Sequence, residues 1–354
     1  MKSFKIGDIT IPVPIVQGGM GIGISLSGLA SAVATAGGVG TIATVGIGLI
    51  YGTPGKSYRQ NNIDGLIQEI RKARQRTKGI LAVNIMSVLT NFTDLVETSI
   101  KEKIDVIFSG AGLPLDLPKF KVSGSKTKLV PIVSSGRAAQ IIAKKWLQNY
   151  NYLPDAFVVE GPKAGGHLGF NYKQLEANEI TLEQLVTDVV NVTEELSLTH
   201  DKKIPVIAGG GITTGQEIKK ILNLGASAVQ LGSSFIATEE CDASLAFKEA
   251  IISSNKDQIR LIKSPVGMPG RAVENEFLLA AERGEKRPKS CKYNCIKSCD
   301  PKTTDYCICE ALLSAYLGKF ESGFAFSGAN AGKIKSITTV NEVFERLQKE
   351  YDLG

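Results

Sequence analysis

The segment from Val158 to Gly169 holds the residues of this chain that are best suited to chemistry. An apolar stretch leads through Glu160 into a loop with four glycines, and the loop carries His167, one of two histidines in the chain. Glycines let the backbone come close to a flat or charged ligand, and a histidine can exchange a proton near neutral pH. We therefore predict a cofactor loop with a catalytic base, His167, while Glu160 could orient a ligand or a neighbouring helix. The second histidine, His200, is expected in a polar loop at the surface.

Other apolar stretches also end in glycine or small polar residues. These ends are Gln17–Met20, Asn84, Ser109–Gly112, Ser134–Gly136, Gly209–Gly211 and Gly232–Ser234. Met20 could pack on an aromatic ring or in the core, and Asn84 could hydrogen-bond a ring amide or cap a helix. The sequence has no nucleophile elbow, no lysine-bearing phosphate loop and no histidine pair for a catalytic zinc, so hydrolase and kinase classes have no support.

Eight short apolar runs alternate with helix-like stretches and predict the elements that position these residues. The runs are 14–17, 39–43, 80–84, 106–109, 129–133, 156–160, 205–208 and 228–231. Continuous apolar strands indicate a parallel sheet buried on both faces. Eight such units favour an α/β fold, the (β/α)8 TIM barrel, over a doubly wound open sheet. Apolar spacing predicts helices at 63–76, 182–196 and 340–351, and another from Thr214 to Gly225.

In a TIM barrel, the loops that follow the strands meet at one face, which is the active-site face. The segments named above would therefore form one site. Glycines after the last two strands, at 209–211 and 232–234, lie where barrels bind phosphate with loop amides. Tight packing of strand against helix is the alternative explanation for these glycines.

The strand and helix alternation ends near residue 240. We predict a barrel over 1–240 and a mainly helical C-terminal elaboration over 241–354, packed on the barrel with no flexible linker between them. The net charge of +6 is scattered, and the basic runs 71–76 and 286–289 lack interleaved aromatic residues, which argues against nucleic-acid binding. There is no signal peptide, and glycines interrupt the apolar run 18–50, so we expect a cytoplasmic protein without a membrane span.

Five of the six cysteines lie between residues 291 and 309. Disulfides are rare in the cytosol, and the spacing of Cys291, Cys295 and Cys299 would place them on one helix face. Because the cluster lacks the usual paired knuckles of zinc sites, we predict reduced thiols and no metal, with zinc or an iron–sulfur cluster as the alternative.

Several motifs occur together in an order that is typical of one family. They are Gln17-Gly18-Gly19-Met20, Ala36–Gly40, Val83–Met86, Glu160-Gly161 with Gly165-Gly166-His167, Ala208–Ile212 and Gln230–Phe235. Over about residues 10 to 275 the chain resembles the nitronate monooxygenase family, formerly called 2-nitropropane dioxygenases. That family includes the flavin-dependent enoyl-acyl-carrier-protein reductases.

The resemblance implies a TIM barrel with non-covalent FMN at the carboxyl ends of the strands. His167 would be the proton-handling residue beside the flavin. The cofactor site would comprise Gly18, Gly19 and Met20 against the ring, Asn84 reaching it, Glu160 near it, Ala164, Gly165 and Gly166 lining it, and Gly210, Gly211, Gly232 and Ser233 holding the phosphate.

The resemblance leaves three functions open. The chain could oxidise alkyl nitronates with O2, which we take as the first expectation. It could instead use NAD(P)H to reduce FMN and then an enoyl thioester. The third alternative is a flavin-binding redox sensor that works through the cysteine cluster. A homodimer also stays open.

Overall fold

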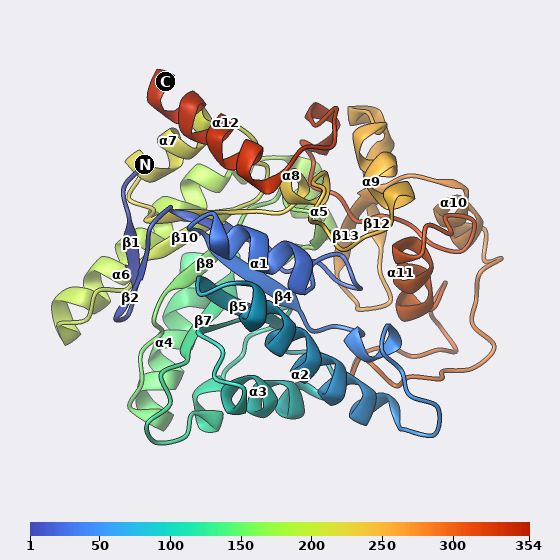
Figure 1. Ribbon diagram of the computed structural model, residues 1–354, viewed down its shortest axis with the longest axis horizontal. Helices are drawn as coiled ribbons and strands as arrows, with labels where there is room; N and C mark the ends of the chain where they lie inside the picture. The colour runs from blue at the N-terminus through green and yellow to red at the C-terminus, as the bar shows by residue number, and fades with distance from the viewer.

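Eight parallel strands close into a barrel in the computed structural model, which describes residues 1–354 (Figure 1). The strands are β3 (Ile15–Gln17), β4 (Val39–Ala43), β5 (Ile80–Met86), β6 (Val106–Gly110), β7 (Lys128–Val133), β8 (Phe157–Glu160), β10 (Val206–Gly209) and β11 (Ala228–Leu231). They are hydrogen-bonded in the order β10-β11-β3-β4-β5-β6-β7-β8. Each of the eight predicted apolar runs overlaps one of these strands, so the predicted TIM barrel is confirmed and the open doubly wound sheet is wrong.

The barrel strands are apolar because both faces of the sheet are covered. Every residue of β4, β6 and β10 is buried. An interior cluster of 13 residues includes Val16 and Phe108, together with Phe4, Ile6 and Ile11 of an N-terminal hairpin. That hairpin, β1 (Phe4–Ile6) and β2 (Ile9–Ile11), packs its apolar residues into the barrel interior and was not predicted from the sequence.

Helices follow the strands around the outside of the barrel. They are α1 (Ser27–Thr35), α2 (Tyr58–Arg76), α3 (Phe92–Lys101), α4 (Gly136–Tyr150), α5 (Tyr172–Ala177), α6 (Leu182–His200), α7 (Gly215–Asn223) and α8 (Ser233–Ile236). The predicted start at Thr214 is confirmed, since Thr214 and Glu217 form a reciprocal capping box. His200 is exposed as expected, but it ends α6 and does not lie in a loop.

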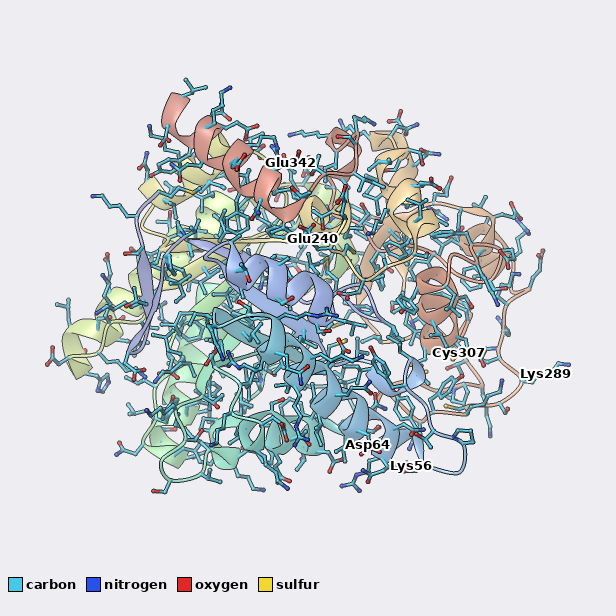
Figure 2. The ribbon with its side chains drawn as sticks, in the orientation of Figure 1. Lys56, Asp64, Glu240, Lys289, Cys307 and Glu342 are labelled. Carbon is cyan, nitrogen blue, oxygen red and sulfur yellow. The ribbon has the colours of Figure 1, made fainter.

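The basic run 71–76 lies on α2, where its side chains pair with acidic neighbours. Arg71 contacts Glu102 at 2.7 Å, and Arg74 contacts Asp105 at 2.6 Å. On the same helix Asp64 pairs with Lys56 at 2.7 Å, at the edge of the molecule (Figure 2). These pairs fit a solvated helix face. No helix of the chain is both long enough and apolar enough to cross a membrane.

The C-terminal segment contains both helices and strands. Its elements are α9 (Leu245–Ile252), β12 (Ile259–Lys263), β13 (Pro269–Val273), α10 (Glu276–Glu282), α11 (Ile308–Tyr316) and α12 (Val340–Leu353). The antiparallel pair β12 and β13 was missed in the expectation of a mainly helical segment. It adds β9 (Gly166–His167) as a third strand, so the segment is joined by backbone hydrogen bonds to the loop after β8. The division of the chain at residue 240 stays a prediction.

The last helix returns to the barrel and packs beside α7 (Figure 1). The Glu240 carboxylate accepts the amide of Val340 at 3.0 Å, near the start of α12 where Glu342 lies (Figure 2). At the other end, the Glu350 carboxylate accepts the amide of Gly215 at 2.7 Å. Acidic side chains thus cap helix N-termini across the boundary between the two parts of the chain.

The segment that carries Cys291, Cys295 and Cys299 is not helical, so the helix face expected for these residues is wrong. The segment instead lies along the loop after β5. The amide of Thr90 donates to the carbonyl of Cys295 at 3.1 Å, and Leu89 and Ile296 form an antiparallel bridge. Backbone groups of the cysteine segment are therefore bonded to the loop after β5, and they are not available for the hydrogen bonds within a helix. No group of three or more His, Cys, Asp or Glu side chains is arranged to hold a metal ion.

Candidate active site

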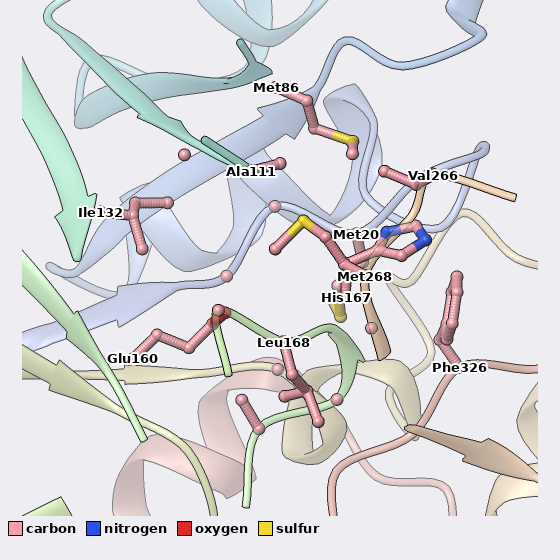
Figure 3. A pocket seen from close by; sticks show the side chains of 18 of the residues that line it. Met20, Met86, Ala111, Ile132, Glu160, His167, Leu168, Val266, Met268 and Phe326 are labelled. Carbon is pink, nitrogen blue, oxygen red and sulfur yellow. The ribbon is translucent and has the colours of Figure 1, made fainter. Parts of the chain in front are cut away.

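One large cavity of about 740 Å³ lies at the carboxyl ends of the barrel strands (Figure 3). Of its 47 lining residues, 24 are hydrophobic, so the few polar groups stand out as candidates for binding or catalysis. Most residues proposed from the sequence line it, namely Gly18, Gly19, Met20, Asn84, Glu160, Ala164, Gly165, Gly166, His167, Gly210, Gly232 and Ser233. Gly211 lies behind this surface, where its carbonyl accepts a hydrogen bond from Asn330.

His167 is positioned by the C-terminal segment. It lies on β9, opposite Gly270 of β13. Its Nε2 atom is 2.7 Å from the hydroxyl of Ser264, which lies between β12 and β13. The ring meets Phe326 edge to face, with centroids 4.9 Å apart, and Figure 3 shows the two rings side by side. A histidine from a barrel loop is therefore held by two residues from the elaboration.

His167 is neutral at physiological pH because burial lowers its pKa to about 4. The Ser264 hydroxyl accepts the amide of Val266 at 3.3 Å and has one proton of its own to donate. If that proton goes to Nε2 of His167, the neutral ring carries its proton on Nδ1. Such a ring has one donor left for a ligand.

Glu160 ends β8 and extends toward the same cavity (Figure 3). Burial raises the pKa of its carboxyl to about 7, and a hydrogen bond from the Gly169 amide opposes the shift. This carboxyl therefore takes up or releases a proton near neutral pH. Burial thus reverses the usual order of the two pKa values in the cavity, so that the Glu160 carboxyl has a higher pKa than His167.

One side of the glycine loop is held by hydrogen bonds and packing within the protein, and the other side faces the cavity. Arg271 Nη1 donates to the carbonyls of Pro162 at 2.6 Å and Ala164 at 2.8 Å. A Cβ on Gly165 would lie 2.6 Å from the amide nitrogen of Gly328, so this glycine serves the packing of the protein. Gly166 has φ of +76° and no protein atom within 4 Å of a Cβ built on it, so its exposed side faces space that a ligand could fill.

The end of the cavity below β10 and β11 is suited to an anion. Gly210 and Gly232 lie outside the helices and strands, and their amides donate to no other group in the chain. Gly210 has φ of +114°, a conformation that only glycine adopts easily. Ser233 begins α8, and its hydroxyl accepts the amide of Gly328 at 3.1 Å. Unpaired amides beside a helix start are typical of phosphate sites.

Two side-chain amides on the cavity wall have no partner for their NH₂ group. Asn84 makes no side-chain hydrogen bond within the protein, and it packs so closely on Gly19 that a Cβ there would lie 2.2 Å from Asn84 Cβ. The alternative role of Asn84 as a helix cap is wrong, because α3 is preceded by Asn91. Gln230 Nε2 is buried and unpaired. Both amides could bond to the polar edge of a bound ring.

A family model described as nitronate monooxygenase matches residues 2–350. The chain belongs to the nitronate monooxygenase family. It is 25% identical over 292 residues to a probable nitronate monooxygenase of Staphylococcus aureus (strain Newman), which covers 76% of this chain and 78% of that relative. A probable nitronate monooxygenase of Staphylococcus saprophyticus is also 25% identical, over 307 residues, with coverages of 77% and 78%.

Solved structures agree with the family in fold. FabK from Thermotoga maritima has a TM-score of 0.74 and 29% identity, covering 96% of this chain and 93% of that one. The nitroalkane oxidase from Streptomyces ansochromogenes also has a TM-score of 0.74, with 22% identity and coverages of 97% and 96%. At that identity the second likeness shows the fold alone.

Four residues of the site in this member of the nitronate monooxygenase family were missed from the sequence. They are Gln230, Ser264, Arg271 and Phe326. Gln230 left a signal, since it is the one polar residue in the apolar run 228–231. The others left none, because they lie beyond residue 240, where no barrel strand gave a frame for placing them.

Proposed function

We propose that the chain is an FMN-dependent oxidoreductase that oxidises alkyl nitronates with O2. The observation that carries this proposal is His167, a neutral histidine that lines an apolar cavity beside the open surface of Gly166. The assignment of His167 as the catalytic residue and of the other named residues to FMN is part of the proposal.

The residues present fit FMN at both of its ends. The unpaired amides of Gly210 and Gly232, with Ser233 beside them, suit its phosphate. Asn84 and Gln230 offer unpaired donors to a ring with polar edges. Bound FMN would supply a ring that accepts electrons from the substrate and passes them to O2.

The low basicity of His167 favours a substrate that is already ionised. A histidine with a pKa of about 4 takes up a proton poorly at neutral pH, so it is a weak base toward a neutral nitroalkane. A nitronate has lost its carbon proton and carries negative charge on two oxygens. His167 can donate its free N–H to one of these oxygens and orient the anion. Met86, Val266 and Met268 supply an apolar wall for the alkyl chain.

A second candidate is the reduction of an enoyl thioester with NADH or NADPH. The likeness to FabK at 29% identity over 96% of the chain supports it, and the nitronate monooxygenase family includes such reductases. The same cavity would then hold the enoyl group against the ring. A cytoplasmic location stays a prediction for either function.

Anaerobic mixing of the FMN-loaded protein with each reductant separates the two functions. We expect ethylnitronate to bleach the flavin absorbance quickly and NADH or NADPH to bleach it slowly. Fast bleaching by a pyridine nucleotide, followed by reoxidation with a crotonyl thioester, would instead establish the reductase. Neutral nitroethane serves as the control, because the weak base predicts that it reacts more slowly than its nitronate.

A further inference from the structure

The active-site cavity continues past His167 to an apolar end against the C-terminal segment, which we call the apolar annex. Its residues come from four parts of the chain and are Ile22, Ile24, Phe247, Ile296, Ile308 and Leu312. All of them line the cavity, and each is at most 8% exposed. They also belong to a single hydrophobic cluster, so the protein core forms the wall of this end of the cavity.

The walls of the annex are held together by contacts with α11. This helix presents two annex residues on one face, one turn apart. A Cβ on Gly23 would lie 2.5 Å from the ring of Tyr316, so the loop 21–24 packs directly on α11. The amide of Ser244 donates to the carbonyl of Tyr316 at 3.4 Å, which places the start of α9 beside the same helix. The annex therefore forms only when the C-terminal segment is docked on the barrel.

The annex is continuous with the cavity wall beside His167. Ser298 donates to the carbonyl of Val266 at 2.9 Å, so the segment with Ile296 lies next to the hairpin loop that lines the cavity. The same segment forms an antiparallel bridge with the loop after β5, the strand that ends on Met86. An alkyl chain that leaves His167 along Val266 and Met86 therefore reaches Ile296 and then the rest of the annex.

The cavity lining has no cation that could pair with a second negative charge on a substrate. None of the 47 lining residues is a lysine or an arginine. Glu160 is the one carboxyl among them, and when ionised it would repel another anionic group. A carboxylate at the far end of a substrate would therefore be buried without a partner, which is strongly unfavourable.

We propose that the substrate is a nitronate with an alkyl chain of several carbons, whose anionic head meets His167 and whose tail fills the apolar annex. The inference rests on the proposed function and narrows its substrate to a molecule with a single charge, at the head. Each methylene group that enters the annex moves from water to an apolar surface, so affinity rises with chain length. The closed end of the annex sets the length at which this rise stops.

The first test is the affinity of the FMN-loaded protein for neutral 1-nitroalkanes, measured without oxygen by isothermal titration calorimetry. These probes carry the same tail and a head of similar shape. From nitroethane to 1-nitrohexane we expect the dissociation constant to fall about fourfold per methylene group, which is the ~0.8 kcal/mol gained by burying one such group. The kcat/KM values of the matching nitronates should rise in the same order. A dissociation constant that is independent of chain length would overturn the proposal.

A charged tail tests the lack of cations in the cavity. The probes 4-nitrobutanoate and 4-methyl-1-nitropentane have nearly the same shape, because a carboxylate in the first replaces an isopropyl group in the second. We expect the carboxylate to bind at least about 100-fold more weakly, since its charge would be buried without a partner. Equal affinities would mean that the tail lies in solvent, and the annex would not be its binding site.

Two adjacent leucines of α11 provide a variant and its matched control. Leu312→Phe narrows the annex and should weaken the binding of 1-nitrohexane, relative to nitroethane, about tenfold. Ile24→Phe narrows it from another wall and should act alike. Leu313 lines a separate hollow with Phe277 and Tyr306, so Leu313→Phe should keep the wild-type dependence on chain length.

The outcomes separate this inference from the proposed function. Equal losses in Leu312→Phe and Leu313→Phe would overturn the annex as the site of the tail. A protein that does not oxidise nitronates but keeps the dependence of affinity on chain length would refute the proposed function alone. A protein that oxidises ethylnitronate and hexylnitronate with equal kcat/KM would refute the annex alone.

Discussion

Nε2 of His167 lies 2.7 Å from Oγ of Ser264, although the two residues are 97 positions apart. One comes from the loop after a barrel strand, and the other from the hairpin of the C-terminal segment. The orientation of the proposed catalytic histidine therefore depends on the docking of that segment. The C-terminal segment therefore positions the histidine that we propose to be catalytic.

Removing the Ser264 hydroxyl should slow turnover without loss of bound FMN. We expect His167→Ala to lower kcat with a nitronate by ~10²–10⁴-fold. Ser264→Ala should lower it about tenfold, the value of one hydrogen bond of about 1.4 kcal/mol. Steady-state kinetics and FMN fluorescence measure turnover and cofactor retention.

The matched control for Ser264→Ala is Ser298→Ala. Ser298 donates to the carbonyl of Val266 at 2.9 Å, so it supports the same loop without contacting His167. It should leave kcat unchanged. Equal losses in the two variants would mean that Ser264 acts only through the stability of the loop.

Substitution by leucine should change the stability of the apoprotein in opposite directions at Gln230 and at Gln17. Gln230 Nε2 is buried without a partner, so Gln230→Leu should stabilise the apoprotein by about 1 kcal/mol, the order of one unpaired buried group. It should also weaken FMN binding about tenfold, through the loss of one donor. Urea unfolding and FMN titration measure the two effects.

Gln17 is the control because its amide is fully bonded inside the barrel. It donates to the carbonyl of Thr41 at 2.8 Å and accepts the amide of Thr41 at 3.1 Å. Gln17→Leu should destabilise the apoprotein by about 3 kcal/mol, since it leaves buried backbone groups unpaired. Destabilisation by Gln230→Leu as well would show that Gln230 has a partner in the apoprotein.

The barrel could be predicted from the sequence because its signal is local. Runs such as 39–43 and 106–109 are short, apolar and followed by glycine or serine, and each pattern depends only on adjacent residues. The rule that barrel loops share one face then brought Asn84 and His167 to the same cavity. Twelve of the proposed residues line it for that reason.

What could not be predicted depends on contacts between distant segments. The strand β9 is two residues long and exists only because β13 pairs with it. The loop of Cys291 has helical spacing, yet its backbone hydrogen bonds to Val88 and Thr90 lead it along the barrel. Gly211 has the same sequence context as Gly210, but it does not line the cavity, and its carbonyl accepts a hydrogen bond from the distant Asn330.

Gly166→Ala should weaken FMN binding beyond what backbone strain explains. Gly166 has φ of +76°, so alanine costs about 1 kcal/mol of strain. Its Cβ would also project into cavity space where no protein atom lies within 4 Å. We expect the FMN dissociation constant to rise at least about tenfold, or about 1.4 kcal/mol. FMN fluorescence titration measures it.

Gly124→Ala is the matched control, because it introduces the same backbone strain at a position away from the cavity. Gly124 has φ of +79°, also with nothing within 4 Å of a Cβ, and it lies in an exposed loop before β7. The two variants should lose similar stability in urea, and only Gly166→Ala should lose affinity for FMN. Equal affinities would place the cofactor away from Gly166.

Glu160 and His167 should give the apoprotein opposing pH dependences of stability. The pKa of Glu160 rises from 4.5 to about 7 on folding, so the native state holds the extra proton between these values. Its contribution to stability is full below pH 4.5 and is lost as the pH rises toward 7. The pKa of His167 falls from 6.5 to about 4, so the unfolded state holds the extra proton between them. Its contribution is full above pH 6.5 and is lost as the pH falls toward 4.

Between pH 4.5 and 6.5 the two contributions have opposite slopes and should largely cancel. Glu160→Gln removes one of them, so its free energy of unfolding should rise with pH by up to about 1.4 kcal/mol per unit relative to wild type. His167→Gln removes the other, so its free energy of unfolding should fall with pH by a similar amount. Urea unfolding of the apoproteins at pH 4.5, 5.5 and 6.5 measures both slopes. Parallel curves for the two variants would show that these side chains are solvated by the cavity and titrate as they do in the unfolded chain.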